Sequence, residues 1–318
     1  MVYELIMKKV ISMSSSGKIA YKMMMIMTKV FPTMKTDFTD VDSTLEKAKR
    51  INERNKYVFP SDKKAMYKEV TISNHPCIVI RSRKAENKKN KALLFIYGGE
   101  TLEWKSEIAM ARRYGDLTGM DVWYPIYPPI TEVNITVTIS VLYETYRAMA
   151  KRYGAENIAI VGDSMGGLFA AGIINHINRT ESDIGMPKLF IANSPSGVPD
   201  TAEDWREMEK YASKDPIFTV NAFRGVGLIA SHGQETPKDT YCPVYMDFRN
   251  APDTYMYFAE ELCAGNARAY KEAYDRAGAG NRLHIHIQPE MMHGYSCMPV
   301  FPESKKVFNE SIRLLNEV

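Results

Sequence analysis

Long apolar runs and a large net charge are both missing from this chain of 318 residues. The methionine-rich run MMMIM at residues 23–27 is far shorter than the roughly 18 apolar residues that span a bilayer, so we expect no integral membrane segment. No basic region leads into a long apolar stretch with a small-residue cleavage site, which argues against a signal peptide. The formal net charge of +3 is too small to indicate a nucleic-acid partner.

Paired cysteines are also missing. Cys77, Cys242, Cys263 and Cys297 are widely spaced, with no CxxC motif. This spacing predicts neither a zinc site nor a disulfide framework, so we interpret the cysteines as reduced thiols of a cytoplasmic protein. We therefore expect no metal and no cofactor. With 45% hydrophobic and 25% charged residues, the composition is that of a globular protein.

Short apolar segments alternate with helical patterns along most of the chain. An edge hairpin is predicted from residues 70–72 and 77–80, which flank an Asn-His-Pro turn. The predicted strands that follow are 92–97, 121–124, 158–161, 189–192, 244–248 and 284–287. The predicted helices are 108–117, 138–153, 168–178, 255–265 and 305–315. This alternation predicts βαβ units, and hence an α/β fold with a mostly parallel central sheet flanked by helices.

Two segments do not follow the alternation. Residues 1–66 form a predicted N-terminal helical cap segment, with methionine-rich amphipathic helices around residues 5–7 and 23–27. These helices could pack on the core, form an acyl-binding cap or lie on a membrane surface. Residues 67–318 form the predicted core. Within it, residues 199–241 contain no strong strand, and a gap of this length is typical of a lid insertion.

The most informative motif joins the predicted strand 158–161 to the predicted helix 168–178. It is Gly162-x-Ser164-x-Gly166. A serine on a sharp strand-to-helix turn is lifted clear of the sheet, and its neighbours two residues away must be very small. The helix that begins there favours negative charge at the reacting centre. We therefore interpret Ser164 as a nucleophile rather than a serine in an ordinary glycine-rich turn.

The sequence GDSMGG at residues 162–167 resembles the GDSAGG motif of the hormone-sensitive-lipase-like esterases, a branch of the α/β-hydrolases. The resemblance covers most of residues 90–318. Met165 stands where alanine is usual, a modest departure because the reaction needs only its backbone N–H. The resemblance implies the α/β-hydrolase fold and hydrolysis of short- to medium-chain acyl esters.

Stabilisation of the tetrahedral intermediate requires N–H donors aimed at its oxyanion. One donor should be Met165, and the others should come from a loop after an earlier strand. The sequence YGGE at residues 97–100 resembles the family's HGGG segment, so Gly98 and Gly99 are the predicted donors. Tyr97 and Glu100, which replace the histidine and the third glycine, are predicted to border the substrate. The alternative is that the two glycines only form a turn.

The base and the acid should follow the nucleophile in the order Ser, Asp or Glu, His. His293 lies after the last predicted strand and before the C-terminal helix, and its segment resembles the family's HGF sequence. It is the predicted base. Asp253 is the predicted acid, because it lies just beyond the predicted strand 244–248. Asp247, inside that strand, is the alternative.

The other histidines downstream of Ser164 receive weaker interpretations. His284 and His286 share one face of a predicted strand. They lack a third ligand nearby, so packing or exposure is a better interpretation than metal binding. His232 lies in the predicted lid and is expected to contact substrate.

These residues predict a serine hydrolase that cleaves small carboxylic esters through an acyl-enzyme. The YPIYPP sequence at residues 124–129 is nearer to that of some formamidases and deacetylases of the fold, so an amidase or deacetylase is an alternative. A non-catalytic binding protein of the same fold is the alternative from another class. The expected partner is a small acyl ester, and a homodimer is compatible with the sequence. Acyl length and leaving group are left open.

Overall fold

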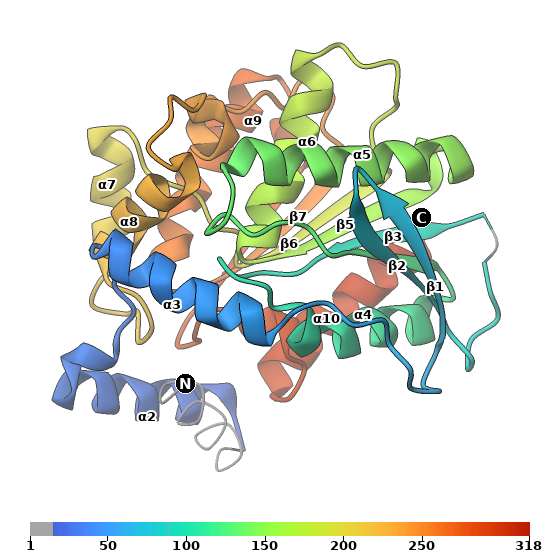
Figure 1. Ribbon diagram of the computed structural model, residues 1–318. Helices are drawn as coiled ribbons and strands as arrows, with labels where there is room; N and C mark the ends of the chain where they lie inside the picture. Colours follow the sequence, from blue (N-terminus) through green and yellow to red (C-terminus); the bar gives the residue numbers. More distant parts are fainter. Residues whose placement is uncertain (1–14, 89) are drawn as a thin grey trace.

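The computed structural model describes residues 15–88 and 90–318. Within these residues, eight strands form one sheet in the order β1-β2-β4-β3-β5-β6-β7-β8 (Figure 1). Their bounds are Met66–Ile72, His75–Arg81, Ala92–Ile96, Asp121–Pro125, Ile158–Asp163, Leu189–Asn193, Asp253–Ala259 and Leu283–Gln288, for β1 to β8. Strand β2 is antiparallel to β1 and β4, and the pairings from β4 to β8 are parallel. The predicted mostly parallel sheet is confirmed.

The central and edge strands differ in sequence because they differ in burial. Strands β3, β5 and β6 are buried at every position, as expected for parallel strands covered on both faces. The edge strands β1 and β8 instead alternate between more and less exposed positions. The predicted hairpin is therefore confirmed as β1 and β2, and it forms one edge of the sheet.

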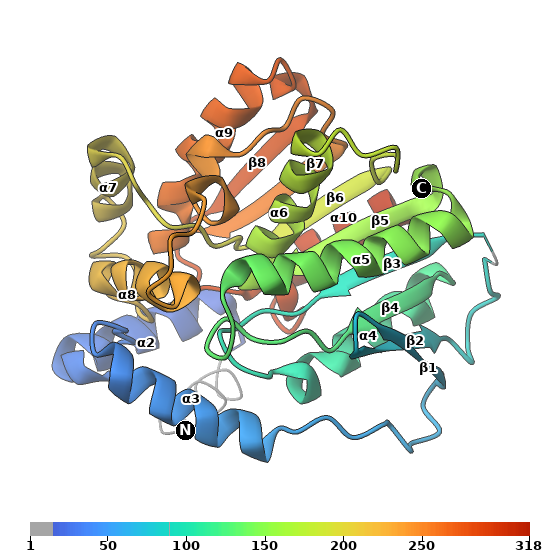
Figure 2. The same ribbon diagram turned by 45° about the horizontal axis from the view of Figure 1, so that its top comes forward.

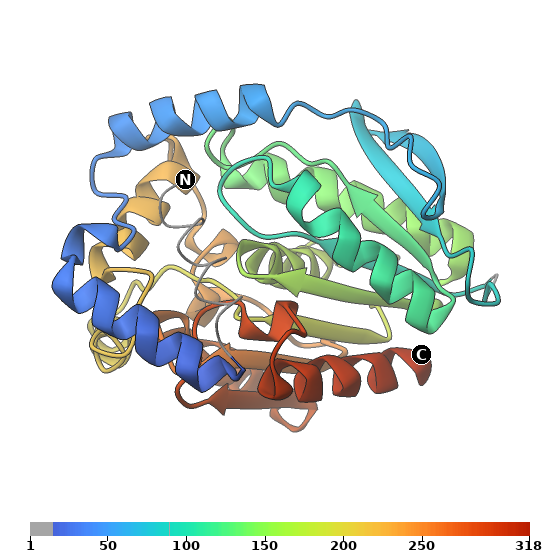
Figure 3. The same ribbon diagram turned by 90° about the horizontal axis from the view of Figure 1, so that it is seen from below.

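Helices cover both faces of this sheet. Figures 2 and 3 show α5 (Ile135–Tyr153), α6 (Met165–Arg179) and α9 (Asn266–Arg276) on one face. They show α4 (Trp104–Thr118) and α10 (Pro302–Asn316) on the other face. The sheet and its helices share one continuous apolar core. This is the layered α/β architecture that the alternation of segments predicts.

A further group of helices lies beside one end of the sheet. It contains α2 (Gly17–Val30), α3 (Val41–Arg54), α7 (Ala202–Glu209) and α8 (Val220–Ser231), as Figures 1 and 2 show. Helix α2 contains the methionine run, whereas residues 5–7 lie outside the described residues. The short 3-10 turns η1, η2, η3, η6 and η7 span Pro32–Met34, Ala155–Asn157, Lys238–Thr240, Gly280–Arg282 and Tyr295–Cys297.

The N-terminal segment is fastened to the predicted lid by backbone hydrogen bonds. The N–H of Thr36 donates to the carbonyl of Ile217 at 2.7 Å, and the N–H of Thr219 donates to the carbonyl of Thr36 at 3.1 Å. The hydroxyl of Thr219 also donates to a carboxylate oxygen of Asp37 at 2.9 Å. Two segments far apart in sequence therefore form one structure.

Two of the predicted elements are wrong. Residues 244–248 are not a strand, because Val244 and Tyr245 belong to the turn η4 (Pro243–Tyr245) and the carbonyls of Val244 and Met246 accept hydrogen bonds from Arg276. Residues 255–265 are not a helix, because they contain most of β7 and the turn η5 (Leu262–Gly265). Aromatic residues are frequent in β7, and they favour strands.

Within the described part of the chain, no helix is both long enough and apolar enough to cross a membrane.

Candidate active site

Ser164 occupies the turn between β5 and α6 in a strained conformation. Its φ of 53° and ψ of −118° lie outside the regions that a residue with a side chain ordinarily adopts. The Ser164 N–H donates to the carbonyl of Asn193 at 2.8 Å, and the Ser164 carbonyl accepts from Ser196 at 3.1 Å. The neighbouring strand thus holds the strained backbone in place, which is a common property of active sites.

The two flanking glycines make this turn sterically feasible. A Cβ on Gly162 would lie 2.4 Å from the carbonyl oxygen of Gly166. A Cβ on Gly166 would lie 2.2 Å from the carbonyl oxygen of Ile96 in β3. Both distances are too short for any side chain, so the sequence pattern Gly-x-Ser-x-Gly follows directly from the close approach of backbone segments.

The structure brings His293 to this serine. Its Nε2 lies 2.8 Å from Ser164 Oγ, although the two residues come from distant parts of the chain. His293 follows β8, and the next N–H, that of Gly294, donates to the hydroxyl of Ser194 at 3.2 Å. The ring of Phe218 contacts the imidazole edge to face, with centroids 5.2 Å apart. The imidazole is therefore oriented for proton exchange with the serine hydroxyl.

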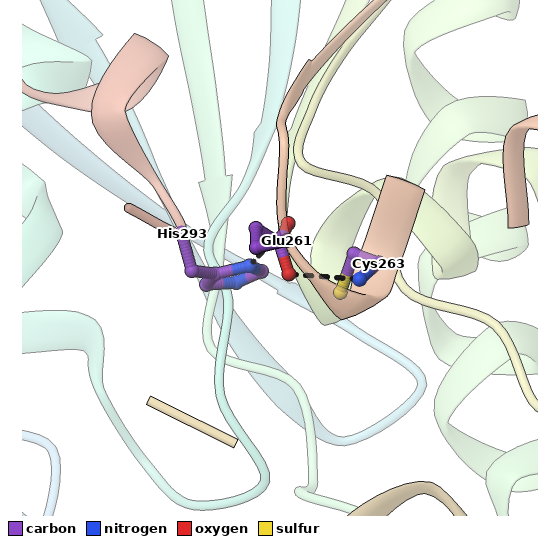
Figure 4. A group of neighbouring side chains, drawn as sticks. All are labelled: Glu261, Cys263 and His293. Atoms are coloured by element: carbon purple, nitrogen blue, oxygen red, sulfur yellow. Dashed lines mark hydrogen bonds and ion pairs between the residues drawn. The ribbon is translucent and has the colours of Figure 1, made fainter. Parts of the chain in front are cut away.

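The carboxylate that contacts His293 is Glu261. Its Oε1 lies 3.2 Å from Nδ1 of His293. Glu261 lies just after the carboxyl end of β7 and is fully buried at 0% exposure. Its other oxygen accepts the backbone N–H of Cys263 at 2.8 Å, which fixes the carboxylate (Figure 4). Ser164, His293 and Glu261 thus form the Ser-His-acid arrangement.

Neither predicted acid lies at this site. Asp253 is the first residue of β7 and is exposed, whereas Glu261 follows the last. The rise of a strand separates its two ends by about 20 Å, so Asp253 lies at the far end from the imidazole. Asp247 instead pairs with Arg249 at 2.9 Å. The error follows from the misplaced strand, because the predicted acid was counted from residues 244–248 and not from β7.

The loop after β3 approaches the nucleophile closely. A Cβ on Gly98 would lie 2.7 Å from the carbonyl oxygen of Asp163. The N–H of Gly98 faces the Glu107 carboxylate, with its nitrogen 3.3 Å from Oε2, which does not agree with its predicted role as an oxyanion donor. Gly99 has a φ of 93°, which favours glycine. Met165 begins α6, where backbone N–H groups lack partners within the helix.

The three predicted substrate contacts lie in different places. Tyr97 is fully buried, stacks on Tyr127 with ring centroids 4.3 Å apart and does not line the pocket, so its position does not agree with the predicted contact with substrate. Glu100 lines the pocket beside Ser164. His232 ends α8, where its Nε2 lies 2.7 Å from the carbonyl oxygen of Ile130, and it does not line that pocket. The expected contact of His232 with substrate does not agree with this position.

The electrostatic environment of the imidazole is set by carboxylates. Burial is the largest influence on the pKa of His293 and acts to lower it. Glu261, Asp215 and Glu100 together outweigh burial, so the pKa is raised above its ordinary value. The same carboxylates favour the positive charge that the imidazole acquires when it takes a proton.

A second pair of carboxyl groups lies beneath the nucleophile turn. Burial raises the pKa of Asp163 to about 6, although Asn193 donates to its carboxylate at 2.7 Å. Burial and the Asp163 charge raise the pKa of Glu107 well above its ordinary value. Each of these two carboxyl groups therefore holds a proton more readily than an ordinary carboxyl group.

Ser164 and His293 open into a small pocket with an empty volume of about 280 Å³. Its apolar wall comes from both of the segments that interrupt the α/β alternation. The residues of this wall are Phe38, Phe218, Ala222, Phe223 and Val226. The pocket therefore combines a reactive serine and imidazole with a short apolar surface.

A family model of the alpha/beta hydrolase fold matches residues 94–297. The chain belongs to this family. Among solved structures, this α/β-hydrolase is similar to an esterase from the bacterial hormone-sensitive lipase family, with 18% identity and a TM-score of 0.73, covering 96% of this chain and 99% of that one. None of the curated proteins gives a significant match.

Two further solved structures give a similar result. A hormone-sensitive lipase from a metagenome library has 18% identity and a TM-score of 0.69, covering 89% of this chain and 99% of that one. An esterase/lipase from an uncultured bacterium has 15% identity and a TM-score of 0.70, covering 88% and 97%. At these identities the similarity shows the α/β-hydrolase fold, and it extends over nearly the whole chain.

Sequence reasoning missed several residues of the α/β-hydrolase site. Glu261 was missed although an acidic pair, Glu260 and Glu261, directly follows the aromatic-rich run of β7. Recognising residues 253–259 as a strand would have placed this pair at its carboxyl end. Phe38 and Cys263 also line the pocket, but no local signal in the sequence indicates this.

Proposed function

We propose that this chain is a serine hydrolase that cleaves small carboxylic esters through an acyl-enzyme. Ser164 is the nucleophile, His293 the general base and Glu261 the orienting acid. The observation that carries the proposal is the 2.8 Å contact between Ser164 Oγ and His293 Nε2 at the pocket. Membership of the α/β-hydrolase family supports it.

The chemistry proceeds in two steps. Nε2 of His293 takes the hydroxyl proton as Ser164 Oγ attacks the ester carbonyl, and the imidazolium then protonates the departing alcohol. Water, deprotonated by the same Nε2, attacks the acyl-enzyme and releases the acid. Glu261 accepts the Nδ1 hydrogen throughout and stabilises the imidazolium.

The oxyanion requires fixed N–H donors. Met165 supplies one from the first turn of α6. Gly99, the other predicted donor of this loop, supplies a second. Gly98 does not, because its N–H is directed to Glu107. Glu100, which replaces the third glycine of the family's segment, lines the pocket together with Ser164 and Met165.

The size of the pocket favours short acyl groups. Residues 1–66 act as a cap and residues 199–241 as a lid, and the pocket contacts of Phe38, Phe218 and Phe223 support both roles. We place the protein in the cytoplasm, because its four cysteines are free thiols of the kind that a reducing compartment preserves. The homodimer and the absence of nucleic-acid binding stay predictions.

The test is hydrolysis of p-nitrophenyl acetate, butyrate and octanoate by the wild type and by Ser164→Ala. We expect the variant to lose about 10⁶-fold in kcat, because removing the nucleophile removes the covalent route. The wild type should prefer acetate and butyrate. A fluorophosphonate probe should label the wild type and leave Ser164→Ala unlabelled.

Ser106→Ala, at an exposed position of α4, is the matched control and should keep wild-type rates. Equal turnover by Ser164→Ala would contradict the assignment of the nucleophile. Absence of both hydrolysis and labelling in the wild type would favour a binding protein of the same fold.

A further inference from the structure

Three potential metal ligands meet beside the nucleophile. The ligand atoms of Glu261, Cys263 and His293 all lie within 4.8 Å of one another, and Figure 4 shows Glu261 between His293 and Cys263. Glu261 and Cys263 are buried, and they are separated by one residue at the start of η5. The cluster is the metal-ligand group found among the described residues.

The donor set suits a borderline-soft divalent cation. A thiolate, an imidazole and a carboxylate are ligands that Zn²⁺ accepts, with water in the fourth tetrahedral position. Zinc bonds of roughly 2.0–2.3 Å place tetrahedral ligands about 3–4 Å apart, so the cluster must contract by about 1 Å. Cys263 lies in η5, after the end of β7, so its side chain can rotate without displacing that strand.

The site is both reachable and electrically suited to a cation. Cys263 and His293 line the same pocket as Ser164, so an ion that enters the pocket meets both. Asp215 and Glu100 act electrostatically on His293 together with Glu261. Asp215 is itself fully buried at 0% exposure. A carboxylate-rich environment of low exposure favours a divalent cation.

We propose that Glu261, Cys263 and His293 form an inhibitory Zn²⁺ site that competes with the catalytic arrangement. The inhibitory part rests on the proposed esterase function. Coordination uses the lone pair of Nδ1, so the Nδ1 proton that now faces Glu261 moves to Nε2. A protonated Nε2 has no lone pair to take the Ser164 proton. The Cys263 thiol releases its proton to solvent, so Zn²⁺, thiolate and carboxylate sum to zero charge.

Metal binding is tested first without any use of activity. Co²⁺ is titrated into the full chain, and the thiolate-to-cobalt charge-transfer band is followed by absorption. We expect the band in the wild type, in Ser164→Ala and in Cys242→Ser, a control at another buried cysteine. We expect its loss in both Cys263→Ser and Cys263→Ala, with Zn²⁺ abolishing the band wherever it occurs. No band in the wild type, or an equal band in folded Cys263→Ser, overturns the site.

Inhibition is tested second. For each variant, the rate with Zn²⁺ is divided by the rate of the same variant without Zn²⁺. Zn²⁺ should lower the p-nitrophenyl acetate rate of the wild type and of Cys242→Ser, and EDTA should restore it. In Cys263→Ser the Zn²⁺ concentration for half inhibition should rise by at least about 10-fold, the lower end of what losing a supporting contact costs a metal site. Equal inhibition of Cys263→Ser overturns the inhibitory role. Because Ser164→Ala reports binding alone, failure of the esterase proposal is distinguishable from failure of the metal site.

Discussion

At the scale of single residues, the site depends on the carboxylate of Glu261, which is buried and accepts two hydrogen bonds. The acid predicted from the sequence, Asp253, lies one strand length away. Glu261 accepts from Cys263 N–H at 2.8 Å and lies 3.2 Å from His293 Nδ1. Asp253 has neither contact, being exposed at the opposite end of β7. The two residues therefore form a natural pair for comparison.

We expect Glu261→Gln to lower kcat for ester hydrolysis on the order of 10⁴-fold, because an amide can hold the imidazole in the wrong tautomer. KM should change little, since Glu261 does not line the pocket. Asp253→Asn is the matched control and should keep wild-type kcat. The reverse pattern in steady-state kinetics would restore Asp253 as the acid.

A second prediction concerns the pH dependence of His293. Catalysis needs its neutral form, and its pKa is raised above the ordinary value, so the acidic limb of kcat/KM should lie above pH 6.5. Glu100 is one cause of that raised pKa, and Glu100→Gln should move the limb to lower pH. Glu235→Gln, at an exposed position, should leave it in place. A limb that does not move in Glu100→Gln contradicts the electrostatic role.

At the scale of elements, the segment between α7 and α8 is fastened to the loop that carries the acid. Asp215 Oδ1 accepts the N–H groups of Ile217 and Phe218 at 2.6 and 2.8 Å, and its Oδ2 accepts the N–H of Leu262 at 3.0 Å. One carboxylate thus holds both Phe218, which contacts the imidazole, and the residue after Glu261. Asp215 is a positioning residue that acts through its neighbours.

This carboxylate should also make stability depend on pH. Burial and the nearby Glu261 raise the pKa of Asp215 to about 7, from an ordinary 3.8, despite the N–H groups it accepts. Between these values the folded chain holds a proton that the unfolded chain releases. This contribution to the free energy of unfolding is therefore full below the lower value and is lost as pH rises toward 7.

Asp215→Asn cannot ionise, so it should lack this part of the pH dependence. The variant should lose stability relative to the wild type because an amide meets backbone N–H donors poorly. The loss should be larger at about pH 5 than at about pH 8, since the wild type gives up its own advantage in between. Urea unfolding at both values measures this. Asp183→Asn, at an exposed position, is the control and should change the free energy of unfolding by the same small amount at both pH values. An equal loss of stability at both pH values in Asp215→Asn would show that Asp215 is ionised throughout, and would contradict the prediction.

The elements also show how far the sequence alone could be interpreted. Ser164 and its strand were predictable because close backbone contacts at Gly162 and Gly166 leave a strict local pattern. Strand β7 was not predicted although its aromatic residues favour strands, because its pairing with β6 is a long-range property. The prediction of the acid was wrong for the same reason, because its position was inferred from the wrong strand. Side chains that meet through tertiary packing, such as Phe38 at the pocket, leave no local signature.

At the scale of the whole molecule, the N-terminal segment reaches across the fold to α8. A Cβ on Gly225 would lie 2.3 Å from the carbonyl oxygen of Phe38, so the two backbones are in direct contact there. Phe38 also lines the pocket. The packing of a distant segment therefore shapes the surface that substrate meets.

We expect Gly225→Ala to force this segment away from α8, although alanine favours helices. The melting temperature should fall, KM for p-nitrophenyl butyrate should rise, and limited proteolysis near residues 31–40 should become faster. Gly227→Ala on the same helix is the control, since its Cβ would lie 3.2 Å from a methyl group of Val198. Equal melting temperatures and equal proteolysis for the two variants would contradict the contact.

The two hydrogen bonds between Thr36 and residues 217–219 affect how substrate enters the pocket and how product leaves it. An outward movement of residues 217–219 must either break both hydrogen bonds or move the N-terminal segment around Thr36 as well. Widening the entrance is thus a concerted displacement of two distant stretches of polypeptide. We expect a bulky alcohol to require this displacement in order to enter and leave the pocket, whereas a small ester should bind without it.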